Sequence, residues 1–289
     1  MPIPLPAVAG VEHRDVELPE VGLHVAQAGA GDPVLLLHGW PQHWWEWRKV
    51  ITLLAGAARL IAPDNRGFGW SGTPGRGYDP DTFAADAVAL LDALGLDRVH
   101  VIGHDWGGYA AQLIALRHPE RVRSLLAIST PHPWLPRTPK ALAGIWRTWY
   151  VVLMASPAGE RLLRSGGFGR RLDGMSPGVF TPEETETYAA VLREPERARA
   201  TTMLYRAYLR TAVRSLTGTP LARARFAMPA RLLIGTRDAA IPLEWCLGLD
   251  RHGDDAATEP VQGGTHWLPE THADLVAARA RELFARAEG

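Results

Sequence analysis

Short apolar segments alternate with helical patterns along most of the chain. Apolar runs that are typical of buried strands occupy residues 33–37, 59–62, 99–102, 122–128 and 231–234. Between most of these runs, apolar residues recur at helical spacing, over residues 45–54, 80–94 and 109–118. Strands that alternate with helices are typical of a mostly parallel sheet with helices on both faces. The pattern therefore predicts an α/β fold.

The first and last strands of the predicted sheet are less regular. Residues 16–18 and 23–27 flank a turn at residues 19–22 that contains proline and glycine. Two such runs around a short turn predict an antiparallel hairpin. A weaker pattern at residues 259–262 predicts the last strand.

The alternation stops at about residue 132. From there to about residue 217 the chain has helical periodicity, clearest over residues 141–154 and 183–192, and few strand signals. A helical block inserted between two strands predicts a cap over one end of the sheet. We therefore expect a core of residues 1–131 and 218–289, with a helical cap at residues 132–217.

Composition narrows the possible partners. Lys+Arg and Asp+Glu each number 31, so the formal net charge is zero and no charge pattern favours nucleic acid or an anionic membrane. A small neutral partner is expected instead. Cys246 is the one cysteine, which excludes an internal disulfide and predicts a small buried side chain. The chain begins without a basic leader, and no apolar run reaches the roughly 18 residues of a membrane span. These features predict a cytoplasmic protein.

Asp105 is the most informative residue for chemistry. It follows the apolar run 99–102, lies among Gly103, Gly107 and Gly108, and precedes a predicted helix. This is the strand–turn–helix context of a nucleophile elbow, where serine is more common. Small neighbours are needed because the nucleophile sits on a sharply turned, strained backbone. An aspartate there would form an alkyl-enzyme ester; the alternative is an ordinary helix cap.

Two further residues complete a possible catalytic triad. Asp238 and His266 each lie in a loop that follows a predicted strand, and the carboxyl ends of parallel strands share one edge of the sheet. The chain order nucleophile, acid, histidine is that of α/β-hydrolases, although either residue alone is more often a turn or surface residue. The main-chain N–H groups of Trp40 and Trp106 are the expected oxyanion donors.

The chain resembles one branch of the α/β-hydrolase family, the epoxide hydrolases and haloalkane dehalogenases. The likeness covers roughly residues 15–285 and is carried by residues 38–41 (HGWP), 64–72 (DNRGFGWSG), 103–108 (GHDWGG) and the Asp238 and His266 loops. The resemblance implies that Asp105 attacks an sp³ carbon and that water activated by His266 hydrolyses the ester. It implies that Asp238 orients His266, and that neither a metal nor a cofactor takes part.

Epoxide hydrolases of this branch open the ring with two cap tyrosines. By resemblance Tyr205, in the segment TMLYR, corresponds to the second of them. The first falls near Leu153, and Tyr150 lies one helical turn earlier on the same face, where it would substitute or would simply pack in the cap. The expected substrate pocket contains Trp40, Trp106, Tyr150, Leu153 and Trp267. We expect hydrolysis of a small apolar epoxide to a vicinal diol, with water as the second substrate.

Two alternatives remain open. A haloalkane dehalogenase would hold the departing halide with the indole N–H groups of Trp106 and Trp40; a non-catalytic protein would bind a small molecule on the same scaffold. Fluoroacetate dehalogenases also resemble the chain, but they carry arginine where Trp106 stands. Other motifs fit poorly: residues 67–72 match G-x-G-x-x-G without opening a helix, and no histidines have metal-ligand spacing. His38, His104 and His132 are expected to be structural.

Overall fold

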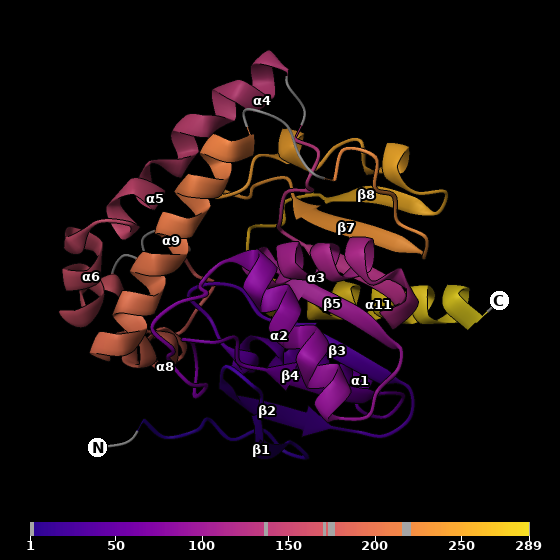
Figure 1. Ribbon diagram of the computed structural model, residues 1–289, viewed down its shortest axis with the longest axis horizontal. Coiled ribbons are helices and arrows are strands. Elements are labelled where there is room, and N and C mark those ends of the chain that lie inside the picture. Colours follow the sequence, from indigo (N-terminus) through magenta and orange to yellow (C-terminus); the bar gives the residue numbers. More distant parts are fainter. Residues whose placement is uncertain (1–2, 136–137, 170–171, 173–176, 216–220, 289) are drawn as a thin grey trace.

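An eight-stranded sheet forms the centre of the computed structural model, which describes residues 3–135, 138–169, 172, 177–215 and 221–288 (Figure 1). The strands are β1 (Glu12–Glu17), β2 (Gly22–Ala28), β3 (Pro33–Leu37), β4 (Arg59–Pro63), β5 (Val99–His104), β6 (Val122–Ile128), β7 (Ala230–Gly235) and β8 (Ala256–Val261). Their order is β1-β2-β4-β3-β5-β6-β7-β8. Pairs β1–β2 and β2–β4 are antiparallel, and the others are parallel.

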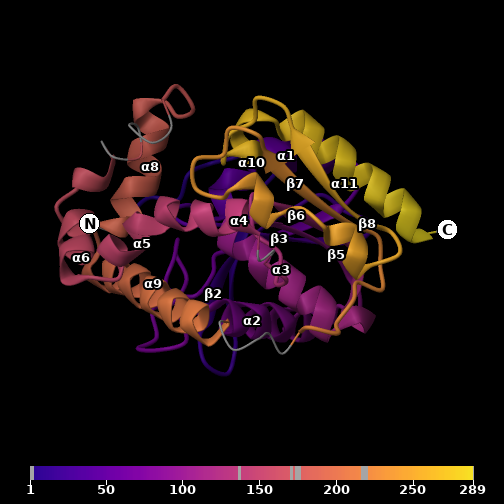
Figure 2. The ribbon, with the colours of Figure 1, turned by 90° about the horizontal axis from the view of Figure 1, so that it is seen from above.

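Helices cover both faces of this sheet (Figure 2). One face carries α2 (Pro80–Ala93) and α3 (Asp105–Arg117), and the other carries α1 (Arg48–Leu54) and α11 (Ala273–Glu288). Strand β3 is apolar on both of its faces because each face is covered by helices. Leu35 and Leu37 pack on the side of α2 and α3, and Val34 and Leu36 pack on the side of α1 and α11. The predicted α/β fold with helices on both faces, and its opening hairpin, are confirmed.

Helix α2 begins where the sequence predicts, because its start is strongly capped. The Asp79 side chain accepts a hydrogen bond from the Thr82 N–H, and Pro80 occupies the first helical turn. The helix ends at Ala93, within a residue of its predicted end.

Several other predicted boundaries are wrong. Helix α3 begins at Asp105 and not at Tyr109. Gly107 and Gly108 have low helix propensity, but they lie in the first turn of the helix because neighbouring atoms leave no room for a larger residue there. Strand β8 begins at Ala256 and not at residue 259, because pairing with β7 extends it through residues of low β-propensity. The predicted helix 45–54 is a 3₁₀ turn η1 (Trp44–Trp47) followed by α1. The predicted helix 141–154 is likewise divided into α4 (Pro139–Ala143), η3 (Gly144–Thr148) and α5 (Trp149–Met154).

The helices between β6 and β7 gather beside one end of the sheet. They include α4, α5, α6 (Pro157–Arg164), α8 (Pro182–Leu192) and α9 (Pro195–Ser215), and α9 contacts α5, α6 and α8. Both ribbon views show them as one group, on the left in Figure 1. The predicted boundary at residues 217 and 218 lies outside the described residues. None of the helices in the described part of the chain combines the length and apolarity needed to cross a membrane.

Candidate active site

Asp105 stands on a strained turn between β5 and α3. Its φ is +48°, in the left-handed region that non-glycine residues seldom adopt. Neighbouring chain holds the turn tightly: a Cβ on Gly107 would lie 2.2 Å from the Leu37 carbonyl oxygen, and one on Gly39 would lie 2.6 Å from the Asp105 Cβ. The predicted strain at this position is thus present, and it fixes the carboxylate at the carboxyl edge of the sheet.

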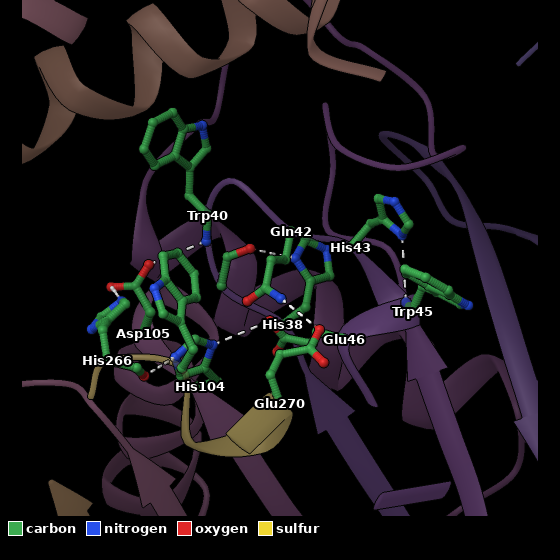
Figure 3. Close-up of polar contacts among 12 residues, drawn as sticks. His38, Trp40, Gln42, His43, Trp45, Glu46, His104, Asp105, His266 and Glu270 are labelled. Carbon is green, nitrogen blue, oxygen red and sulfur yellow. Dashed lines mark hydrogen bonds and ion pairs between the residues drawn. The ribbon is translucent and has the colours of Figure 1, made fainter. Parts of the chain in front are cut away.

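Three loops bring Asp105, Asp238 and His266 together. His266 Nδ1 lies 2.9 Å from Asp238 Oδ2, and its Nε2 lies 3.9 Å from Asp105 Oδ1 (Figure 3). The other Asp238 oxygen accepts the N–H groups of Ala240 and Ile241, each at 2.8 Å. Asp238 therefore closes its own turn and also orients the imidazole, which directs Nε2 toward Asp105.

Electrostatics in this cluster favour a charged resting state. Burial disfavours the His266 imidazolium, but the Asp238 carboxylate, its hydrogen bond and the Asp105 charge raise the pKa of His266 to about 9. Burial raises the pKa of Asp105, and the charge of His266 and two main-chain N–H groups oppose that rise. Each group therefore favours the charged form of the other.

The two oxygens of the Asp105 carboxylate have different surroundings. Oδ2 accepts the main-chain N–H of Trp40 at 3.1 Å, and the main-chain N–H of Trp106 also hydrogen-bonds the carboxylate. Oδ1 faces His266. Charge that develops on Oδ2 is therefore stabilised by a fixed donor, the Trp40 N–H, while Oδ1 lies on the side of the imidazole.

Aromatic side chains from the helical group face this carboxylate. The Tyr205 ring on α9 lies 5.1 Å from that of Trp40, 5.8 Å from that of Trp106 and 6.0 Å from that of Tyr150 on α5. Burial raises the pKa of Tyr205 well above its ordinary value, and Tyr150 and the Asp105 charge add to the rise. The phenol therefore keeps its proton across the physiological range.

Hydrogen bonds determine which of these aromatic side chains, the aromatic wall of the site, still have a hydrogen to donate. The Trp40 indole N–H donates to Thr201 Oγ1 at 3.1 Å. The Trp106 side chain hydrogen-bonds Tyr205; because indole nitrogen only donates, the phenol oxygen is the acceptor. The Tyr205 hydroxyl hydrogen is thereby left for a partner in the site.

The remaining pocket residues lie around the same cluster. Tyr150 is close enough for the Asp105 charge to raise its pKa, after the larger effect of burial, and Leu153 is half-buried in the same apolar cluster. The Trp267 ring lies 4.9 Å from the His266 ring and 5.3 Å from that of Phe180. Trp40, Trp106 and Tyr150 thus surround Tyr205, while Trp267 lies against His266.

Three residues near the site are not among those predicted from the sequence. Tyr208 lies 5.5 Å from Trp106, ring to ring, and its pKa is raised by burial and by the Asp105 charge. Its spacing of three from Tyr205 on α9 is a signal that could have found it. Phe168, with its ring 5.1 Å from that of Trp40, and Thr201 had no such signal.

The residues expected to be structural have the following contacts. His38 donates from Nδ1 to the Gly39 carbonyl and accepts the Asn65 N–H at Nε2, both at 2.8 Å. Ser71 is buried and donates to the Asp64 carbonyl at 2.6 Å, so it is no nucleophile. Within the described residues no group of three or more His, Cys, Asp or Glu side chains could hold a metal ion.

Comparison with known proteins places this geometry in context. A family model described as alpha/beta hydrolase fold matches residues 32–272. The chain is 36% identical to a soluble epoxide hydrolase of Corynebacterium sp. (strain C12), over 68% of this chain and 72% of that protein. It is 40% identical to epoxide hydrolase 2 of Siraitia grosvenorii over 41% of this chain and 39% of that protein. The solved structure of epoxide hydrolase CorEH superposes with a TM-score of 0.82 at 29% identity, covering 95% of this chain and 99% of that one.

Proposed function

The chain belongs to the α/β hydrolase fold family, and from that membership and the geometry of its site we propose that it hydrolyses epoxides to vicinal diols. One observation carries the proposal: an aspartate on the strained turn lies between an imidazole–carboxylate pair and a tyrosine whose hydroxyl is free to donate. The similarity to proteins named epoxide hydrolases supports the same conclusion.

The first step is ring opening by Asp105. Oδ1, which carries none of the Trp40 hydrogen bond, attacks a ring carbon and forms the ester bond as the carbon–oxygen bond of the epoxide breaks. The ring oxygen takes the hydroxyl proton of Tyr205 and becomes an alcohol. The Trp106 N–H stabilises the tyrosinate that results.

The second step is hydrolysis of the ester. Ester formation removes the Asp105 charge, and with it one of the effects that raise the pKa of His266. The imidazole then loses its proton more easily and acts as the base for water, which attacks Cγ of Asp105. Charge on Oδ2 is stabilised by the Trp40 and Trp106 N–H groups until the diol leaves. The proton that His266 loses after ring opening returns to the Tyr205 tyrosinate. When the tetrahedral intermediate collapses, the bond between Cγ and the alkyl-bearing oxygen breaks, and the diol alkoxide takes the remaining hydrogen of the attacking water. The proton that His266 took from water stays on the imidazole, so an imidazolium again lies beside an ionised Asp105, as at the start.

The helical group completes the site in this proposal. Residues 132–217 act as a cap that supplies Tyr205 and Tyr150 and excludes bulk water from the carboxylate. Its aromatic wall favours a small apolar substrate. A cytoplasmic location stays a prediction.

The alternatives are less well supported. A dehalogenase that used Trp40 as a halide donor would need a free indole N–H, but that group is bonded to Thr201. A non-catalytic binder has no use for a strained aspartate beside an oriented imidazole. Diol formation from styrene-type epoxides, measured beside halide release from chloroalkanes and bromoalkanes, tests the choice. We expect diol alone; halide release without diol contradicts the proposal.

A further inference from the structure

A buried acid–histidine pair lies next to the proposed catalytic cluster and takes no part in the steps above. Glu46, in η1, and His104, the last residue of β5, have fully buried side chains. His104 Nδ1 lies 3.1 Å from Glu46 Oε2, and His104 Nε2 lies 3.0 Å from the main-chain carbonyl oxygen of His266 (Figure 3). The pair thus connects the first turn after β3 to the loop that carries the proposed base.

Counting protons leaves only two states of this pair that carry no net charge. A carbonyl oxygen can only accept, so His104 Nε2 must carry a hydrogen and donate it to His266. The 3.1 Å contact between Nδ1 and Oε2 also needs one hydrogen, because two bare acceptors repel. Either a neutral Glu46 donates to a neutral imidazole, or an ionised Glu46 accepts from an imidazolium.

The surroundings favour the neutral state. No protein donor in the described part of the chain reaches the second oxygen, Glu46 Oε1, which suits the carbonyl oxygen of an acid better than half of a carboxylate. The titratable groups that act on Glu46 include His104, His38 and Glu270, and Glu46 in turn acts on His266. The His38 ring is bonded to the Gly39 carbonyl and to the Asn65 N–H, and Glu270 is itself an acid. Burial is the largest effect and raises the pKa of Glu46; Glu270 adds to the rise, while His104 and His38 oppose it without cancelling it.

We propose that Glu46 is a protonated acid that donates to His104, and that this neutral pair positions His266 for ester hydrolysis by holding its main-chain carbonyl. The inference rests on the proposed function for the step it serves. Glu46 and His104 touch neither substrate nor reacting atoms, so they are positioning residues.

A neutral Glu46 also favours the second step of the proposed reaction. An ionised Glu46 would join Asp238 and Asp105 in favouring the protonated form of His266. A protonated His266 cannot take a proton from water, so an additional buried negative charge would slow the second step. A neutral hydrogen-bonded chain holds the loop in place without that penalty.

Two variants of Glu46 separate position from charge. In Glu46→Gln the amide N–H still donates to His104 Nδ1, so both steps should proceed within about threefold of the wild-type rates. In Glu46→Leu the donor is lost, and we expect ester hydrolysis to slow by about tenfold or more while ester formation is little changed. Rapid-quench measurement of the ester resolves the two rates, and thermal unfolding checks that each variant is folded.

The protonation state can be read directly in the wild-type protein. ¹⁵N-histidine NMR should show His104 as a neutral imidazole with its hydrogen on Nε2. A doubly protonated His104, or a Glu46→Gln variant as slow in ester hydrolysis as Glu46→Leu, overturns the proposal. The NMR result does not depend on turnover, so absence of diol formation would refute the proposed function without affecting the assignment of the pair.

Discussion

At the scale of single residues, hydrogen bonds determine which side chains of the proposed site can still donate to a substrate. Trp106 donates to the Tyr205 oxygen and Trp40 donates to Thr201, so neither indole N–H competes for the substrate. Tyr205 accepts the Trp106 N–H and so keeps its own hydroxyl hydrogen for a substrate. Tyr150 and Tyr208 stand nearby without such a defined partner among these contacts.

Tyr205→Phe tests the role of the Tyr205 hydroxyl. Loss of the acid should lower kcat/KM for epoxides by about 100-fold or more, because general acid catalysis contributes at least that much. Tyr208→Phe, on the same helix and beside the same indole, is the matched control and should change the rate less. Steady-state diol formation measures both. Equal rates for Tyr205→Phe and the wild type would remove Tyr205 from the mechanism.

The three residues of the proposed triad share a local signature in the sequence, whereas the pair of Glu46 and His104 has none. Asp105, Asp238 and His266 each follow a strand, so the fold itself brings them to one edge. Glu46 and His104 lie 58 positions apart, and no local pattern shows that their side chains meet. The sequence predicts a structural role for His104, but its contact with the His266 carbonyl depends on how two loops pack.

At the scale of elements, helix α8 is tied to the core by a buried polar cluster. Arg48 on α1 pairs with Glu184 on α8, and it also donates to Glu270 on α10 (Leu268–Thr271) at 2.7 Å. The Tyr188 hydroxyl, on α8, donates to the same Glu270 oxygen at 2.6 Å. Because α10 follows His266 directly, this cluster couples the helical group to the loop of the proposed base.

Tyr188→Phe should destabilise the protein measurably. Glu270 is 1% exposed and loses one of its donors, which costs about 1–3 kcal/mol of unfolding free energy. For a chain of this size that corresponds to a fall in Tm of about 2–10 °C. Glu186→Gln, which breaks an ion pair between exposed partners on the same helix, is the control and should change Tm little. Calorimetry that shows equal shifts for the two variants would contradict the role given to the cluster.

The sequence predicts the bounds of an element correctly where one hydrophobic pattern dominates. The prediction is wrong where tertiary packing determines the local backbone. Strands β3 and β6 have the predicted bounds, because their apolar runs are buried on both faces. The 3₁₀ segments η1 and η3 interrupt runs that read as continuous helix. Tertiary packing overrides helical propensity at these places, and a single sequence carries no record of it.

At the scale of the whole molecule, the proposed site links stability to pH. His266 is contributed by the loop after β8, and its charged partners by the loops after β5 and β7. The fold therefore holds the imidazolium beside two carboxylates that are apart in the unfolded chain. This raises the pKa of His266 from 6.5 to about 9.

The sign of the effect follows from linkage. A folded-state pKa above the unfolded value contributes stability that is fully present below pH 6.5 and is lost as the pH rises through about 9. Wild-type unfolding free energy should therefore fall across this window relative to that of His266→Gln. Denaturant titrations at a series of pH values provide the measurement, and parallel curves for the two proteins would show that His266 does not titrate in this way.

The central claim is that Asp105 forms a covalent ester that His266 removes. We expect His266→Gln to form the ester and fail to hydrolyse it, because ring opening needs only the carboxylate and the acid. The variant is treated with an epoxide that the wild type converts, then digested, and the peptide containing Asp105 is examined by mass spectrometry, with Asp105→Ala as the control. We expect an added mass of one epoxide on the Asp105 peptide and none in the control. No adduct on Asp105, with a substrate proven in the wild type, would contradict the claim.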